Sequence, residues 1–179
     1  QSHGVSYIGR AAGMTDGHKE LARWFEANSG PLTLYARQWL DDHAAADVVQ
    51  DAFVSLLGLR RRPDDVRAWL FRAVRNAALN ELRRRRVRDR HADAVAAARP
   101  AWFQPQLDDR LDAQAVQQAL ADLPAQQAEL IVMRIWGQMT YEQMAEVVGE
   151  PLSTARDRYV AALESLRRRM VTPCQPKIE

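Results

Sequence analysis

Residues 140–160 read Thr-Tyr-Glu-Gln-Met-Ala-Glu-Val-Val-Gly-Glu-Pro-Leu-Ser-Thr-Ala-Arg-Asp-Arg-Tyr-Val. Thr140 followed by Gln143 matches the capping box that starts a helix, and Gly149 permits the positive φ that a tight turn commonly needs. The first helix should bury Tyr141, Met144, Ala145 and Val148. Ser153 is suited to cap a second helix, whose expected apolar stripe is Ala155, Tyr159, Leu163, Leu166 and Met170. The spacing therefore predicts a helix, a tight turn and a second helix.

In a DNA-binding helix-turn-helix, the second helix enters the major groove with its N-terminal residues facing the base edges. The candidates for that contact are Ser153, Thr154, Arg156, Asp157 and Arg158, with Tyr159 or Val160 beyond them. An ordinary αα-hairpin inside a bundle is the alternative, because the motif alone does not exclude it.

Helical periodicity continues upstream of this motif. A helix is expected from about Lys19 to a break at residues 28–31, Asn-Ser-Gly-Pro, with a second helix from there to about Leu40. A third helix should run through Leu59 and bury Val49, Ala52, Phe53, Leu56 and Leu57. Further helices are expected over residues 111–123 and 124–136. No alternating run rich in valine or isoleucine occurs, so the fold class is all-α.

A long helix is expected from about Asp65 to Arg88, with Asp64 as its cap. Its predicted core stripe is Val66, Trp69, Leu70, Ala73, Val74 and Ala77. Trp69 could instead stack on an unpaired base, but its apolar neighbours favour a place in the core.

The pattern divides the chain into two small helical domains joined by a flexible linker. The domains are assigned to residues 19–90 and 110–170, and the linker, where periodicity fades, to residues 91–109. Residues 1–18 are interpreted as an expression remnant or disordered segment, because residues 1–13 lack periodicity and precede a methionine. Residues 171–179 form a tail, and its single cysteine, Cys174, is interpreted as inert.

Charge is segmented along the chain although the net charge is only +2. Residues 21–90 carry 14 basic and 9 acidic groups, residues 108–150 carry 2 and 8, and residues 151–169 carry 5 and 2. Two basic blocks suggest two surfaces that meet a polyanion, whereas the acidic block should avoid it or meet another protein. No apolar run approaches the length that crosses a bilayer, which excludes a transmembrane protein.

Four segments in order resemble the small extracytoplasmic-function group of bacterial sigma-70 factors. They are Ala46–Phe53, Arg67–Asn76, Leu123-Pro124 and Thr140–Gly149. The resemblance implies sigma region 2 at 19–90, region 4 at 110–170, and a protein that guides core RNA polymerase to promoter DNA and helps to open it. It also implies that an anti-sigma factor is a possible partner. A cytoplasmic location is expected because a single cysteine suits a reducing compartment.

The resemblance implies roles for named residues. Asp47, Gln50 and Asp51 match the part of region 2 that docks on the polymerase largest subunit, although a merely solvated helix face has the same pattern. The minus-10 element would be bound, in duplex and melted form, by Arg60, Arg61, Arg62, Asp64, Arg67, Arg72, Asn76, Asn80 and Arg83. The loop at residues 60–65 is shorter than is usual in the family. The recognition helix departs from the usual family pattern at Asp157, Val160 and Ala161, which leaves Arg156 and Arg158 as its main donors for the minus-35 element.

Two other functions compete with this interpretation. A free-standing helix-turn-helix regulator would explain residues 138–170 but not the upstream motifs. A nuclease would use Asp41, Asp42, His43 and Asp47, but capping is the commoner role at a helix start. The sequence therefore predicts no enzymatic activity, no metal and no cofactor.

Overall fold

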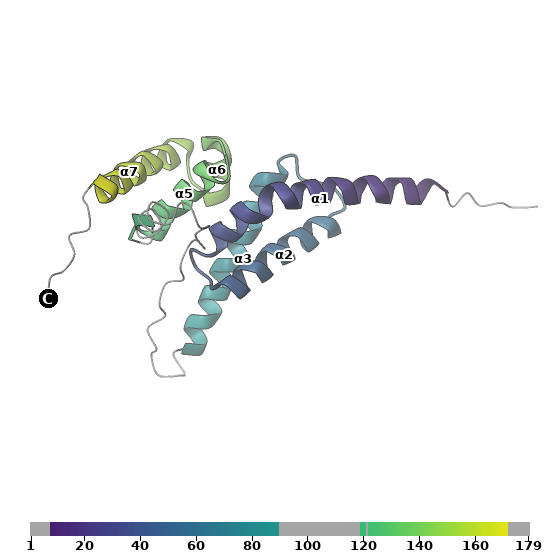
Figure 1. Ribbon diagram of the computed structural model, residues 1–179, viewed down its shortest axis with the longest axis horizontal. Coiled ribbons are helices and arrows are strands. Elements are labelled where there is room, and N and C mark those ends of the chain that lie inside the picture. Colours follow the sequence, from purple (N-terminus) through teal and green to yellow (C-terminus); the bar gives the residue numbers. More distant parts are fainter. Residues whose placement is uncertain (1–7, 90–118, 121, 172–179) are drawn as a thin grey trace, which may run out of the picture.

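The computed structural model describes residues 8–89, 119–120 and 122–171. Within these ranges the chain contains helices and no strand, which confirms the all-α prediction. The helices are α1 (Ile8–Ala36), α2 (Asp42–Gly58), α3 (Val66–Asp89), α5 (Ala125–Ile135), α6 (Tyr141–Val148) and α7 (Leu152–Val171). Figure 1 shows α1, α2 and α3 gathered on one side and α5, α6 and α7 on the other. The predicted linker at residues 91–109 lies outside the described residues.

Helix α1 is continuous, so the break predicted at residues 28–31 is wrong. Pro31 has no backbone N–H to donate, which normally weakens a helix interior. Buried side chains immediately after it, Leu32, Tyr35 and Ala36, hold the helix on the core, and the Asn28 side chain donates to the Trp24 carbonyl at 2.8 Å. Tertiary packing thus outweighs the local breaker signal. The helix begins at Ile8, ahead of the expected Lys19, and residues 37–40 form a turn instead of helix.

Helix α2 is capped by Asp41, whose Oδ1 accepts from the Ala44 N–H at 3.0 Å. Its buried stripe contains Val49, Ala52, Phe53 and Leu56, as predicted. Leu57 was expected in the same stripe but is 52% exposed. It directly follows the buried Leu56, so its side chain points about 100° further around the helix and away from the packed face.

Helix α3 begins one residue later than its predicted cap implies. Asp65 is the capping residue, with Oδ1 accepting from the Ala68 N–H at 2.9 Å, whereas the Asp64 side chain is 97% exposed. Trp69 is partly buried and packs against the hydrophobic core, in agreement with its predicted core role. Phe71 is fully buried and was absent from the predicted stripe.

The helix-turn-helix is present as predicted. Thr140 and Gln143 form both bonds of the capping box, and Gly149 has φ 73°. Ser153 was expected to cap the second helix, but α7 already begins at Leu152 and its first turn closes on the Pro151 carbonyl. Met170 is 49% exposed, so the predicted apolar stripe ends before it.

The two halves of the described chain pack against each other. Helix α5 contacts α1, and α6 contacts α3. Their buried side chains belong to one continuous hydrophobic cluster, which includes Tyr35 and Phe71 from the first half and Leu130 and Met144 from the second. This arrangement sets which candidate residues remain accessible.

Candidate polymerase and nucleic-acid interfaces

The outer face of α2 carries Asp47, Gln50 and Asp51, and all three side chains are exposed. Val54 lies on the same face one turn further along and is 65% exposed, and Leu57 follows it. Sequence reasoning treated this face as a polar stripe and missed its apolar part. The signal was present, because Val54 falls at helical spacing from Asp47, Gln50 and Asp51. Exposed apolar groups among charges are typical of a protein-binding surface.

The loop at residues 60–64 is only partly free. Arg60 and Arg61 are exposed, and Arg61 makes a long ion pair of 3.6 Å with Asp64. Arg62 is held by Glu20 of α1 at 2.8 Å, which fixes the loop on the bundle. Two arginines of the predicted base-contacting set therefore face solvent here.

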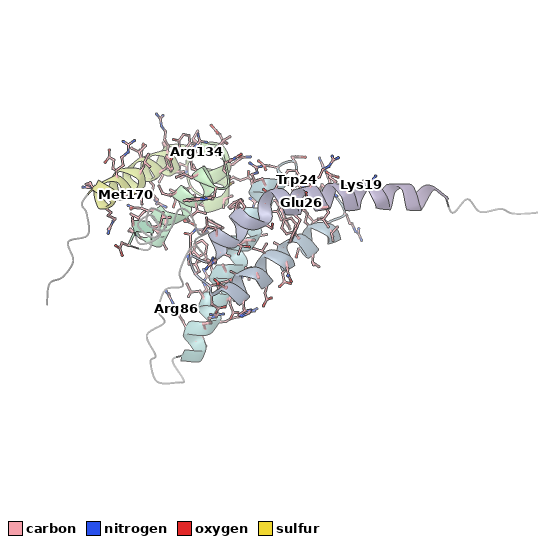
Figure 2. The ribbon with its side chains drawn as sticks, viewed as in Figure 1. Lys19, Trp24, Glu26, Arg86, Arg134 and Met170 are labelled. Atoms are coloured by element: carbon pink, nitrogen blue, oxygen red, sulfur yellow. The ribbon has the colours of Figure 1, made fainter. Side chains whose placement is uncertain are left out.

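The predicted line along α3 divides into two groups. Arg67 donates to the Gly137 carbonyl at 3.1 Å, and Arg72 pairs with Glu146 of α6 at 3.1 Å. Asn76, Asn80 and Arg83 are exposed further along the helix, and Arg83 donates to the Asn80 Oδ1 at 3.2 Å. The structure thus brings Asn80 and Arg83 together on the open part of α3, which leads towards Arg86 (Figure 2).

Arg75 belongs to the same helix but was absent from the prediction. Its guanidinium donates to both carboxylate oxygens of Glu129, at 2.9 and 3.4 Å, and Glu129 also accepts from the Tyr35 hydroxyl at 3.2 Å. Burial, together with the nearby Glu129 charge, raises the pKa of Tyr35 well above its usual value. Burial lowers the pKa of Arg75, but the hydrogen bond and charge of Glu129 more than offset that effect and raise it. Tyr35 and Arg75 therefore stay protonated at neutral pH, and both donate hydrogen bonds to Glu129.

The recognition helix exposes Ser153, Thr154, Arg156 and Asp157 at its first turns. Arg158 is different, because Glu150 in the preceding turn holds its guanidinium at 2.6 Å. An open hollow of ≈ 460 Å³ lies beside Arg156, and it is lined by Tyr141, Glu142, Leu152, Ser153 and Arg156.

Two further residues shape the front of this domain. Hydrogen bonds from its own backbone N–H and from Thr140 lower the pKa of Glu142, so the hollow keeps a negative charge on one wall. Arg134, labelled in Figure 2, donates to the Met139 carbonyl at 2.6 Å and lies 5.0 Å from the Tyr141 ring. Arg134 therefore braces the start of the motif, and Arg156 is the exposed cation at the hollow.

Two of the four residues of the nuclease alternative, Asp41 and Asp42, have structural partners instead. Asp41 caps α2 and pairs with Arg85 at 2.7 Å, and Asp42 pairs with Arg37 at 2.7 Å. In the described part of the chain, no group of three His, Cys, Asp or Glu residues could hold a metal ion. The helices described there also include none that is long and apolar enough to cross a membrane.

Comparison with known proteins accounts for both halves. A family model described as Sigma-70 region 2 matches residues 24–88, and one described as Sigma-70, region 4 matches residues 113–166. The chain belongs to the sigma-70 family. Sigma region 2 and region 4 bind core RNA polymerase and promoter DNA, so this sigma factor acts in transcription initiation. A free-standing helix-turn-helix regulator is not favoured, because it leaves region 2 unexplained.

Relatives of the sigma factor place it in the extracytoplasmic-function group. It is 27% identical to the ECF RNA polymerase sigma factor SigL of Mycobacterium tuberculosis, over 89% of this chain and 94% of the relative. It is 30% identical to the ECF RNA polymerase sigma factor RpoE of Cereibacter sphaeroides, over 59% of this chain and 58% of that one. It is 23% identical to the sigma factor SigV of Bacillus subtilis, over 69% and 74% of the two chains.

Two solved structures share the fold of the sigma factor. The sigma factor RpoE of Bartonella quintana, solved in complex with the anti-sigma factor NepR, superposes with a TM-score of 0.74 at 23% identity, covering 88% of this chain and 98% of that one. CnrH, solved with the cytosolic domain of CnrY, gives 0.61 at 24% identity, covering 87% and 90%.

Proposed function

We propose that this sigma factor docks on core RNA polymerase through the outer face of α2, formed by Asp47, Gln50, Asp51, Val54 and Leu57. The observation that carries the proposal is the mixture of exposed acidic, amide and apolar side chains on one helix face. Such a face pairs an apolar contact with charged groups that steer the encounter and fix its orientation.

The minus-10 element is assigned to the loop and to α3. Arg60 and Arg61 are exposed on the loop, and Asn76, Asn80 and Arg83 follow along the helix. Arginines attract the phosphate backbone, and amide groups discriminate the edges of unpaired bases. Holding unstacked bases shifts the duplex towards the melted state without any covalent step, so the proposed function requires neither a cofactor nor enzymatic activity.

The minus-35 element is assigned to the first turns of α7. Ser153, Thr154 and Arg156 are exposed there, with Asp157 as an acceptor. Arginine can bind a guanine edge with two hydrogen bonds, and carboxylate can accept from cytosine. Arg158 joins this set only when its bond to Glu150 is released.

An anti-sigma factor is a further proposed partner. The proposal is supported by RpoE of Bartonella quintana, which was solved with the anti-sigma factor NepR and has the same fold. The protein is assigned to the cytoplasm, because promoter DNA and RNA polymerase are there in bacteria.

The deciding experiment is reconstitution with bacterial core RNA polymerase. The sigma factor should co-elute with core enzyme and direct initiation from a defined set of promoters in a genomic DNA library. If the chain instead binds a palindromic DNA site as a dimer without polymerase, the proposal is contradicted.

A further inference from the structure

An exposed apolar side chain lies on the outer face of the recognition helix. Val160 of α7 is 45% exposed, and Ala161 beside it is exposed as well. The packed side of α7 is the opposite one, where Ala155, Ala162 and Leu166 are buried. A single exposed valine is ordinary on a protein surface, so the meaning of Val160 depends on its neighbours.

Those neighbours are the residues assigned to base contact. Seven residues make nearly two helical turns, so Val160 points within about 20° of the direction of Ser153. Arg156 lies one turn before Val160, at a rise of about 6 Å along the helix. All three side chains are exposed. A base pair rises about 3.4 Å, so with α7 in the major groove Val160 reaches a base within about two pairs of the one that Arg156 contacts.

Charge on this face gives DNA little attraction. Arg156 is opposed by two exposed carboxylates, Asp157 and Glu164. Arg158 is held by Glu150 at 2.6 Å. Carboxylates repel the phosphate backbone, so contacts that need no charge must supply part of the sequence discrimination.

The major groove offers an apolar group for such a contact, the C5 methyl of thymine. A valine side chain has no hydrogen-bond donor or acceptor, so it gains free energy by covering this methyl group. Against a G·C pair, the same side chain would cover polar edges and leave them without a partner. Valine also has one strongly preferred χ1 rotamer in a helix, so little side-chain entropy is lost on contact.

We infer that Val160 reads the methyl group of a thymine in the minus-35 element, within about two base pairs of the guanine that Arg156 contacts. The inference rests on the proposed role of α7 in reading that element. The contact buries apolar surface and requires no hydrogen bond. Because the major groove distinguishes A·T from T·A, the thymine should lie on a defined strand.

The test removes the methyl group without changing base pairing, by replacing thymine with uracil. Holoenzyme reconstituted from the full chain and bacterial core RNA polymerase first selects upstream sequences from a randomised duplex library. A fluorescein-labelled duplex of the selected sequence is then made with uracil at each thymine position in turn. Fluorescence anisotropy measures the affinity of the holoenzyme for each duplex, and circular dichroism checks that each sigma variant retains its helices.

Uracil at one position should weaken binding of the parent by about 4-fold, as expected for one buried methyl group. Val160→Ala should bind the thymine and uracil duplexes nearly equally. Val160→Ile keeps an apolar side chain and should retain the sensitivity to uracil. The matched control is Val87→Ala, which shortens an exposed valine of α3 and should keep the thymine preference of the parent.

Three results would overturn the inference. The first is a selected sequence without a thymine near the guanine, and the second is binding that uracil weakens at no position. The third is a uracil effect of equal size in the parent and in Val160→Ala, because the methyl group would then act on another residue or on DNA shape.

Arg156→Ala separates these failures from a failure of the proposed function. If Arg156→Ala loses the preference for guanine at one position, α7 still reads the minus-35 element and only the role of Val160 is wrong. If the library yields no preferred upstream sequence, neither Val160 nor Arg156 reads DNA, and the proposed role of α7 fails as well.

Discussion

Asp65 and Gln143, which start two helices of different domains, are hydrogen-bonded to each other. Asp65 caps α3 with one carboxylate oxygen, and its other oxygen accepts from the Gln143 side chain at 2.6 Å. Gln143 is at the same time the distal member of the capping box of α6. The bond therefore couples the N-terminus of the proposed DNA-binding helix of region 2 to the helix-turn-helix of region 4.

This geometry predicts different costs for two adjacent aspartates. Asp65→Ala should lower the free energy of unfolding by about 1 to 2 kcal/mol, because α3 loses its cap and Gln143 loses an acceptor. Asp64→Ala should change it by less than about 0.5 kcal/mol, since its side chain is almost fully exposed. Urea denaturation followed by circular dichroism measures both. Equal losses for the two variants would contradict the assignment of the cap.

Local signals predicted much of the fold. The Thr140 capping box and the turn at Gly149 need only neighbouring residues, and both are present as expected. The cap of α3 was placed one residue early because both Asp64 and Asp65 have the right chemistry. The helix break predicted at Pro31 was wrong for another reason, because packing of α1 on the core outweighs the effect of a local helix breaker.

The contacts between the halves could not be predicted in the same way. Tyr35 and Glu129 are 94 positions apart, and no periodicity relates them. The charge blocks suggested that the acidic segment would avoid a polyanion or meet another protein, whereas Glu129 and Glu146 of that segment pair with arginines of the same chain. Val54 was missed on the outer face of α2 because the neighbouring polar groups matched a known motif, and Leu57 was wrongly placed in the buried stripe.

The docking face of α2 should matter for polymerase binding and little for folding. Replacing Asp47, Gln50 and Asp51 together by alanine should change stability by less than about 0.5 kcal/mol per site. Val54→Ser should also weaken association, because its exposed apolar area would be buried in the complex. Affinity for core polymerase is measured by fluorescence anisotropy of the labelled sigma factor. Glu164→Ala is the control for loss of an exposed charge. If the α2 variants bind core polymerase as tightly as the parent, the outer face of α2 is not the docking surface.

The cap of α2 should make stability sensitive to acid. The hydrogen bond from the Ala44 backbone N–H, and then that from Arg85, lower the pKa of Asp41 below its ordinary value of 3.8. Its contribution is therefore complete above about pH 4 and is lost as the pH falls through the lowered pKa of the folded state. Asp41→Ala should cost about 1 kcal/mol at neutral pH and progressively less in acid. Asp51→Ala is the matched control on the same helix, and denaturation at several pH values makes the comparison.

Arg156 should read sequence, whereas Arg168 should only bind phosphate. Arg156 is exposed at the first turns of α7, and Arg168 lies in its last turn. Arg156→Ala should relax preference at one position of the minus-35 element, because a bidentate contact to guanine is worth about 1 to 3 kcal/mol. Arg168→Ala should weaken all sequences alike and reduce the salt dependence. Binding to a randomised upstream DNA library distinguishes them, and uniform weakening by Arg156→Ala would make it a phosphate contact.

Glu150 should restrain Arg158 and so limit the affinity of region 4 for DNA. The carboxylate holds the guanidinium at 2.6 Å from the turn before the recognition helix, and both side chains are partly buried. Glu150→Gln should release Arg158 for a phosphate, which tightens binding to upstream DNA and makes the slope of log affinity against log salt steeper by about 1. The double variant with Arg158→Ala is the control, because the gain should disappear when the released group is absent. A gain that survives in the double variant would arise from the lost negative charge and not from the freed arginine.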